Sequence, residues 1–108
     1  MIDTDIYSLL HPTVAEIQAK VSERFRIPRI EMISARRARE VARPRQVAMY
    51  LAKQLTTLSL PNIGKHFGNR DHTTVMHACR QVERLMAADR AMRSDVLKLR
   101  RTLERIAS

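Results

Sequence analysis

Four consecutive polar residues, Asp71, His72, Thr73 and Thr74, carry side chains suited to contacts with the edges of DNA bases. An Asp carboxylate accepts a hydrogen bond from the cytosine amino group, a Thr hydrogen-bonds or touches a thymine methyl, and a His donates or accepts. None of the four is needed for the apolar stripe of the helix that they would begin. Asp71 is also a typical N-cap residue, so a cap followed by solvated side chains explains the segment equally well when it is taken alone.

The residues before this segment predict a helix-turn-helix. Ser59 is a cap residue, and Pro61 behind it is favoured in the first turn of a helix. Residues 68–70 (Gly-Asn-Arg) predict a tight turn, because Gly and Asn both tolerate positive φ. In this motif the first residues of the second helix meet base edges in the major groove. Apolar side chains at helical spacing are Ile63 and Phe67 in the first helix and Val75, Ala78, Cys79, Val82 and Leu85 in the second.

Basic charge is concentrated around this motif. The chain has 20 basic and 11 acidic side chains, a formal net charge of +9. Residues 34–80 hold nine basic and two acidic side chains, 9 − 2 = +7. Lysines and arginines release condensed counterions when they contact phosphates, so this distribution predicts a polyanionic partner. The alternative is a basic surface that is simply solvated.

An arginine-rich segment, residues 34–40, has no apolar face and is predicted to be a loop. Flexible arginines such as Arg36, Arg37 and Arg39 can enter a narrow A·T-rich minor groove. Without the neighbouring motif, a solvated charged loop explains the segment about as well. Phosphate contacts set register and affinity but not sequence, and the candidates for them are Arg43, Arg45, Lys53 and Lys65.

The rest of the chain predicts an all-α domain, because no window alternates apolar and polar residues as a strand would. Thr13 and Glu16 form a Thr-x-x-Glu capping box for a helix that Pro28 is expected to stop. A long helix is expected to have Pro44 near its first turn and Lys53 exposed, and a last helix to run over about residues 90–106.

The expected core follows the apolar periodicity. Its predicted residues are Val14, Ile17, Val21 and Phe25 in the first helix, Ile30, Met32 and Ile33 in a short apolar turn, Val47, Tyr50, Leu51 and Leu55 in the long helix, and Met92, Val96, Leu99, Leu103 and Ile106 in the last. We therefore expect a lead-in at residues 1–12 and one small domain of five to six helices at residues 13–108.

Other functions lack the residues that they need. The spacings of His66, His72 and His77 match no metal site, and no carboxylate cluster or thiol pair completes one. The single cysteine, Cys79, is expected to be a buried structural thiol rather than a nucleophile. No phosphate-binding loop and no catalytic acid–base pair is present, so we expect no nucleotide site, no cofactor and no enzyme activity. Without a long apolar run or a signal peptide, the expected compartment is the cytoplasm.

Three segments resemble one family. Residues 67–78 (FGNRDHTTVMHA) look like the signature of the C-terminal DNA-binding domain, domain IV, of the bacterial replication initiator DnaA. Residues 41–51 (VARPRQVAMYL) and 58–64 (LSLPNIG) match the same family in order and spacing. The resemblance covers about residues 13–106. It implies a TrpR-like helix-turn-helix fold that binds short, partly A·T-rich DnaA boxes in double-stranded DNA, such as those at the chromosomal origin.

The resemblance also implies a role for individual residues. Base readers would be Arg37 in the minor groove and Asp71, His72, Thr73 and Thr74 in the major groove. The sugar-phosphate backbone would be contacted by Arg45, Lys53, Leu60, Pro61 and His77, with Leu60 and Pro61 acting through main-chain groups.

Two departures from the family bear on function. Asn69 stands where the family usually has a second Gly, and Asn can adopt the same turn conformation. DnaA carries an ATPase domain ahead of this one, which drives oligomerisation and origin opening, and we expect no such domain within these 108 residues.

Three interpretations of the chain follow. One is the DNA-binding domain of a DnaA protein. Another is a stand-alone paralogue that regulates initiation by competing for boxes or by contacting the initiator or its regulators. A helical interaction module without DNA binding is a third, and the presence of Arg37, Lys53 and residues 71–73 argues against it.

Overall fold

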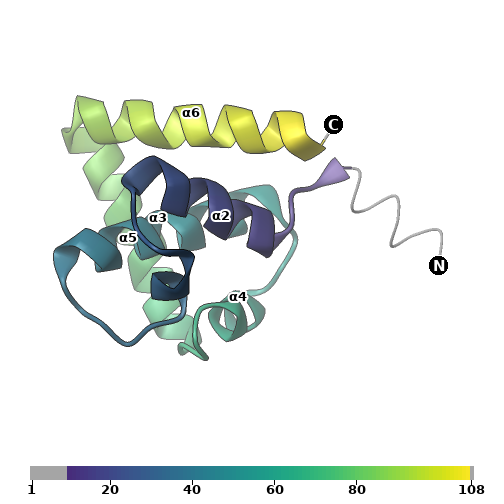
Figure 1. The fold of residues 1–108 in the computed structure, drawn as a ribbon, viewed down its shortest axis with the longest axis vertical. Coiled ribbons are helices and arrows are strands. Elements are labelled where there is room, and N and C mark those ends of the chain that lie inside the picture. Colours follow the sequence, from purple (N-terminus) through teal and green to yellow (C-terminus); the bar gives the residue numbers. More distant parts are fainter. Residues whose placement is uncertain (1–9, 108) are drawn as a thin grey trace.

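A computed structural model describes residues 10–107, leaving the first nine residues of the predicted lead-in outside. Within that range the chain is entirely helical and has no strand, as predicted (Figure 1). The elements in order are α2 (Val14–Phe25), the 3-10 helix η1 (Arg29–Met32), α3 (Arg39–Leu55), α4 (Leu60–His66), α5 (His72–Ala88) and α6 (Arg90–Ala107).

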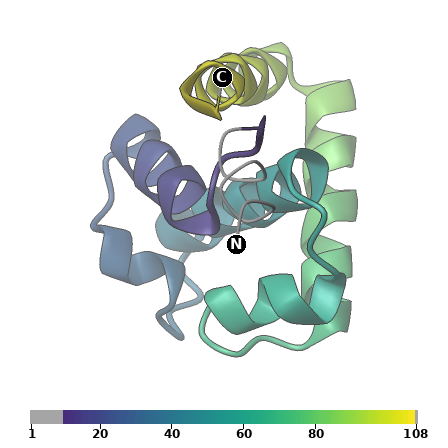
Figure 2. The ribbon, with the colours of Figure 1, turned by 90° about the vertical axis from the view of Figure 1, so that its right-hand side faces the viewer.

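Helices α3 and α5 form the centre of the fold. They pack against each other, α2 packs on α3, and α4 packs on α5. Helix α6 lies at one end of the domain and α4 at the other, with α5 running between them (Figures 1 and 2). The α6 end and the α4 end of the molecule are therefore separate surfaces. The core between the helices is apolar and includes Ile17, Met32, Val47, Leu51, Ile63, Phe67, Val75, Val82, Val96 and Leu103, all at most 1 % exposed.

Helix α2 begins as predicted and ends earlier than predicted. Both hydrogen bonds of the capping box are present, from Glu16 N–H to Thr13 Oγ1 at 3.0 Å and from Thr13 N–H to Glu16 Oε1 at 2.8 Å. The helix stops at Phe25 because Arg26 adopts a left-handed conformation with φ 58°. Ile27 N–H then bonds to the Ser22 carbonyl at 3.1 Å, which closes the helix before Pro28 is reached. The prediction that Pro28 stops the helix is therefore wrong.

The short apolar turn after α2 contributes one core residue rather than three. Met32 is fully buried, whereas Ile30 is 64 % and Ile33 is 50 % exposed. A 3-10 turn of four residues has one face against the domain, so it buries only the side chain on that face.

Helix α3 begins at Arg39, five residues before Pro44. Pro44 therefore lies inside the helix, and the prediction that it lies near the first turn is wrong. A proline there has no N–H to give to the carbonyl four residues earlier. Pro44 is buried, so its packing offsets the missing hydrogen bond. The predicted stripe of Val47, Tyr50, Leu51 and Leu55 is buried, and Lys53 is exposed, as predicted.

The helix-turn-helix forms where it was predicted. Ser59 Oγ accepts from Asn62 N–H at 3.3 Å and caps α4. Gly68 (φ 78°) and Asn69 (φ 58°) both take the left-handed conformation and reverse the chain. Arg70 N–H bonds to the Gly64 carbonyl at 2.9 Å, which holds the turn against α4.

Helix α6 packs along one side of its length. Asp89 Oδ1 caps it by accepting from Ala91 N–H at 2.9 Å and Met92 N–H at 3.1 Å. Val96, Leu99 and Leu103 are buried, but Ile106 is 43 % exposed and so lies outside the core, contrary to the prediction.

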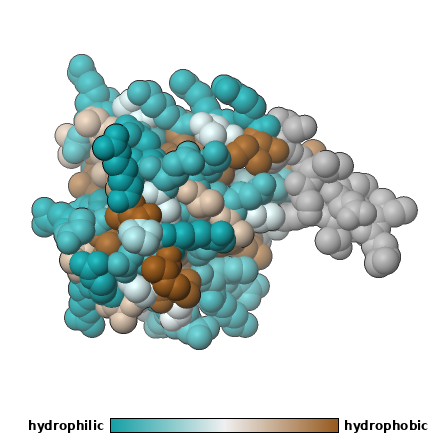
Figure 3. All heavy atoms as spheres, in the orientation of Figure 1, coloured by the Kyte–Doolittle hydropathy of each residue, from teal (hydrophilic) through white to brown (hydrophobic). Residues whose placement is uncertain are grey.

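Hydrophilic side chains cover most of the surface seen in Figure 3, and hydrophobic ones form small separate patches. No helix in the described part of the chain is long and apolar enough to cross a membrane.

We predict that Gly64→Ala destabilises the domain. A Cβ at this position would lie 2.0 Å from the Arg70 carbonyl oxygen, a backbone atom that cannot rotate away. Overpacking of this kind costs about 1–3 kcal/mol, whereas Gly→Ala in an unobstructed helix stabilises by about 1 kcal/mol. Urea unfolding is therefore expected to show a lower midpoint.

Lys65→Ala, at an exposed position in the same helix, is the matched control. Its free energy of unfolding should stay within about 0.5 kcal/mol of that of the parent chain. A Gly64→Ala midpoint equal to or above that of the parent would contradict the close contact.

Candidate nucleic-acid interface

The four predicted base readers in the major groove lie together at the start of α5. Asp71, His72 and Thr74 are exposed, and Thr73 is half-buried. Asp71 stands at the N-cap position, but its side chain makes no capping hydrogen bond. Its Oδ2 instead accepts from Thr73 Oγ1 at 2.7 Å, and its Oδ1 lies 3.0 Å from His72 Nδ1. The carboxylate thus contacts the side chains of the two residues that follow it and makes no N-cap hydrogen bond.

These contacts also set the protonation of Asp71. The hydrogen bond from Thr73 is the main cause that lowers the pKa of the Asp71 carboxyl, and His72 contributes in the same direction. Slight desolvation opposes them. The carboxylate is therefore ionised at neutral pH and acts only as a hydrogen-bond acceptor. Asp71 can accept from an exposed donor such as a base amino group through the lone pairs that Thr73 and His72 leave free.

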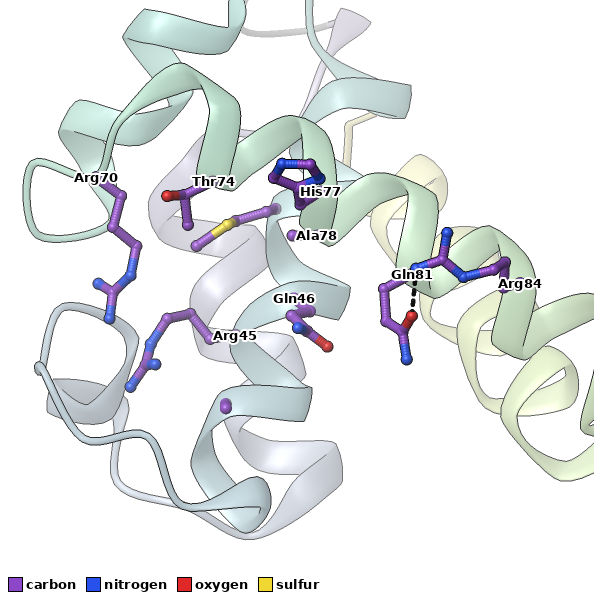
Figure 4. Close-up of a pocket in the computed structure, with 10 residues that line it drawn as sticks. Arg45, Gln46, Arg70, Thr74, His77, Ala78, Gln81 and Arg84 are labelled. Atoms are coloured by element: carbon purple, nitrogen blue, oxygen red, sulfur yellow. Dashed lines mark hydrogen bonds between the residues drawn. The ribbon is translucent and has the colours of Figure 1, made fainter.

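A groove runs between α3 and α5 beside these residues. Thr74, His77 and Gln81 line it from α5, and Arg45 and Gln46 from α3 (Figure 4). An adjoining hollow is lined by Arg37, Arg45, Arg70 and Thr74, so the groove continues from α5 to the arginine-rich loop. Of the predicted base readers, Arg37 and Thr74 therefore border one continuous surface.

Arg36 and Arg37 are neighbours in the loop but differ in their ion pairs. Arg36 Nη1 lies 2.8 Å from Glu31 Oε2, and its Nη2 lies 3.6 Å from Glu40 Oε1. Arg37 is exposed and forms no hydrogen bond or ion pair with the residues that the structure describes. Of the two, Arg37 is the cation that remains available to a partner.

Arg45 differs from the other predicted backbone contacts because it is only 4 % exposed. Its Nε and Nη2 donate to the Glu31 carbonyl at 3.0 and 2.7 Å, and its Nη1 donates to the Arg36 carbonyl at 3.0 Å. Burial is the main cause that lowers the pKa of Arg45, with a smaller contribution from the charge of Arg70. The sequence predicted only a phosphate contact for Arg45 and did not indicate these hydrogen bonds within the domain. The phosphate contact stays a prediction.

Arg70 is a residue whose importance the sequence did not indicate. Its guanidinium is half-buried, and Nη2 donates to the Ser34 carbonyl at 2.7 Å while Nη1 donates to the Phe67 carbonyl. Burial lowers its pKa. Both acceptors are backbone carbonyls, which every residue has, so no pattern of side-chain types reveals these bonds.

The remaining predicted backbone contacts lie around α5. Lys53 is exposed in the last turns of α3 and close enough to Cys79 of α5 for its charge to lower the pKa of that thiol. Leu60 is half-buried and Pro61 exposed in the first turn of α4, and His77 is exposed on α5. Successive residues of a helix are 100° apart, so Cys79 lies on a different side of α5 from Thr74, His77 and Gln81. Lys53 and the groove therefore flank α5 on two sides.

Cys79 itself is half-buried, less than the sequence predicted. Burial is the largest cause that raises the pKa of its thiol, followed by the charge of Glu83. Over residues 10–107 no three His, Cys, Asp or Glu side chains are grouped so as to hold a metal ion.

Comparisons with known proteins agree with this geometry. The model of the bacterial DnaA protein helix-turn-helix matches residues 14–82. The chromosomal replication initiator protein DnaA of Gluconobacter oxydans is 65 % identical over 92 residues, which are 85 % of this chain and 19 % of that protein. The DnaA proteins of Ruegeria sp. and Cereibacter sphaeroides are 58 % and 56 % identical over 92 residues, again 85 % of this chain and 20 % of each relative.

The chain thus spans about a fifth of the length of the curated relatives that it matches. The family match covers the helix-turn-helix, the arginine-rich loop and the groove between them. By sequence and by fold, the chain belongs to the bacterial DnaA helix-turn-helix family.

Proposed function

We propose that this domain binds double-stranded DNA sequence-specifically, at DnaA boxes, in the initiation of chromosomal replication or its regulation. The observation that carries the proposal is the cluster of exposed Asp71 and His72 with half-buried Thr73 at the first turn of α5, in a helix-turn-helix. In that motif this turn enters the major groove.

In the major groove the cluster reads base edges as a unit. Asp71 is a fixed acceptor, and its bonds to Thr73 and His72 restrict the orientations of both side chains. A side chain that is already oriented loses less conformational entropy on binding. Thr74 lies one residue further along and borders the groove, and we expect it to lie between base edges and backbone.

Backbone contacts come from both flanks of α5. Lys53 and the first turn of α4, with Leu60 and Pro61, serve one strand, while His77 and Arg45 border the groove toward the other. A helix seated in the major groove has a phosphate backbone on each side, so contacts on two flanks fix its position. Arg37 then enters the neighbouring minor groove, where an A·T-rich sequence attracts arginine.

The target and the biological setting are inferred from the family. The DnaA relatives are named as chromosomal replication initiators, and the chain matches the helix-turn-helix of that family. The DnaA box is the target that the resemblance to domain IV implies. A cytoplasmic domain of this kind acts as the DNA-binding part of an initiator or as a regulator that competes for boxes or contacts initiation proteins. It holds no nucleotide or other cofactor in this proposal.

His72→Ala and Thr73→Ala are each expected to weaken binding to a DnaA-box duplex by about 1–3 kcal/mol. The reason is the loss of a base-edge contact, which scrambled DNA does not provide. Titration of both variants on a box duplex and on a scrambled duplex at one salt concentration measures the effect. Thr102→Ala on α6, at the other end of the domain, is the control. Equal losses on the two duplexes would show that His72 and Thr73 do not read bases.

Lys53→Ala is expected to weaken binding to both duplexes and to reduce the salt dependence of binding, because one phosphate contact is lost. The slope of log K against log salt should fall in magnitude by about 0.9. Lys98→Ala removes the same charge from an exposed position on α6 and should leave the slope nearly unchanged. The same slope for Lys53→Ala and Lys98→Ala would remove Lys53 from the interface.

A further inference from the structure

We infer that Arg70 joins the major-groove and minor-groove parts of this interface into one unit and is a positioning residue for Arg37. The inference rests on the proposed function, since it concerns how the two reading elements are held relative to each other. It is carried by contacts between the turn of the helix-turn-helix and the loop, segments more than 30 residues apart in the chain.

The guanidinium of Arg70 connects the two segments directly. Nη1 donates to the Phe67 carbonyl at the end of α4, and Nη2 donates 2.7 Å to the Ser34 carbonyl in the loop. Arg70 lies two residues before His72, and Ser34 lies three residues before Arg37. The guanidinium of Arg70 therefore joins the turn before α5 to the loop that carries Arg37.

Gly68 supplies a second contact between the same segments. A Cβ at Gly68 would lie 2.5 Å from the Ile33 carbonyl oxygen, and the residue has φ 78°. Only the absence of a side chain lets the backbone of the turn lie on the backbone of the loop. The contact between turn and loop is thus built from two adjacent points rather than from one hydrogen bond.

The loop is also fixed on its other side, by α3. Arg45 donates to the carbonyls of Glu31 and Arg36, and its Nη2 lies 3.1 Å from Ser34 Oγ. Ser34 Oγ in turn donates to Glu31 Oε1 at 2.6 Å. Arg45 therefore shapes the loop, while Arg70 sets where the loop lies relative to α5.

The chemistry of arginine suits this position. A guanidinium offers five N–H donors in a rigid plane and so reaches two separate carbonyls with fixed geometry. A lysine ammonium keeps the charge without that planar fork. Replacing Arg70 with Lys therefore separates a role in positioning from a role as a simple cation.

The test is a cycle of Arg70→Ala, Arg37→Ala and the double variant on box duplexes with A·T-rich or G·C-rich flanks. The parent chain is expected to prefer the A·T-rich flank about tenfold, a typical value for one base pair read in a site. Arg37→Ala should abolish that preference. Arg70→Ala should reduce the preference for the A·T-rich flank to within about twofold of that of Arg37→Ala. The double variant should have the same flank preference as Arg37→Ala.

The ratio of box to scrambled affinity provides the control for general damage. This ratio should be the same in Arg70→Ala as in Arg37→Ala, because α5 still reads its bases in both variants. A larger drop in this ratio, or a flank preference equal to that of the parent chain, would overturn the inference. Loss of box preference in the parent chain itself would instead overturn the proposed function.

Two further measurements complete the test, and the first of them does not depend on DNA affinity. Amide hydrogen exchange at Arg36, whose N–H bonds to Ser34 Oγ at 3.3 Å, should speed up in Arg70→Ala, while exchange at Val75 and Val82 stays unchanged. Unchanged exchange in the loop would contradict the link. Arg70→Lys should show the reduced flank preference of Arg70→Ala. Full restoration by Lys, which preserves only the charge, would show that Arg70 acts as a cation at the DNA.

Discussion

The close approach of α4 to the turn that follows it is the constraint on which the interface depends. Gly64 and Arg70 are joined by a backbone hydrogen bond of 2.9 Å, and no side chain fits between them. This contact fixes the direction in which α5 leaves the turn. The direction of α5 decides where His72 and Thr73 point, so in the proposed complex the placement of these two residues depends on Gly64.

Sequence patterns predicted the elements of this fold well where a local rule decides the structure. The capping box at Thr13 and the turn at residues 68–70 depend on neighbouring residues only, and both formed as expected. The rules failed at two places: a left-handed Arg26 ends α2 before Pro28 does, and Pro44 lies within a helix. A buried proline can be tolerated when its packing compensates for the lost hydrogen bond, and the sequence does not show that packing.

The candidate site also contains residues that the sequence predicted and residues that it did not. The polar cluster at residues 71–73 was predictable because its residue types differ from the apolar stripe beside it. The structural roles of Arg45 and Arg70 were not, because their partners are backbone carbonyls. Two of the nine basic side chains in residues 34–80 thus donate hydrogen bonds to the backbone of the domain itself, so the count of nine overstates the number of fully solvated cations in that segment.

The central claim is that this domain distinguishes a DnaA box from other DNA. The most direct test is a titration of the unmodified chain against a box duplex and a scrambled duplex of equal length, at two salt concentrations. The account predicts that both affinities fall as salt rises and that the box is bound at least about 10³-fold more tightly than the scrambled duplex. Equal affinity for the two duplexes would contradict it and leave only a basic surface that binds DNA of any sequence.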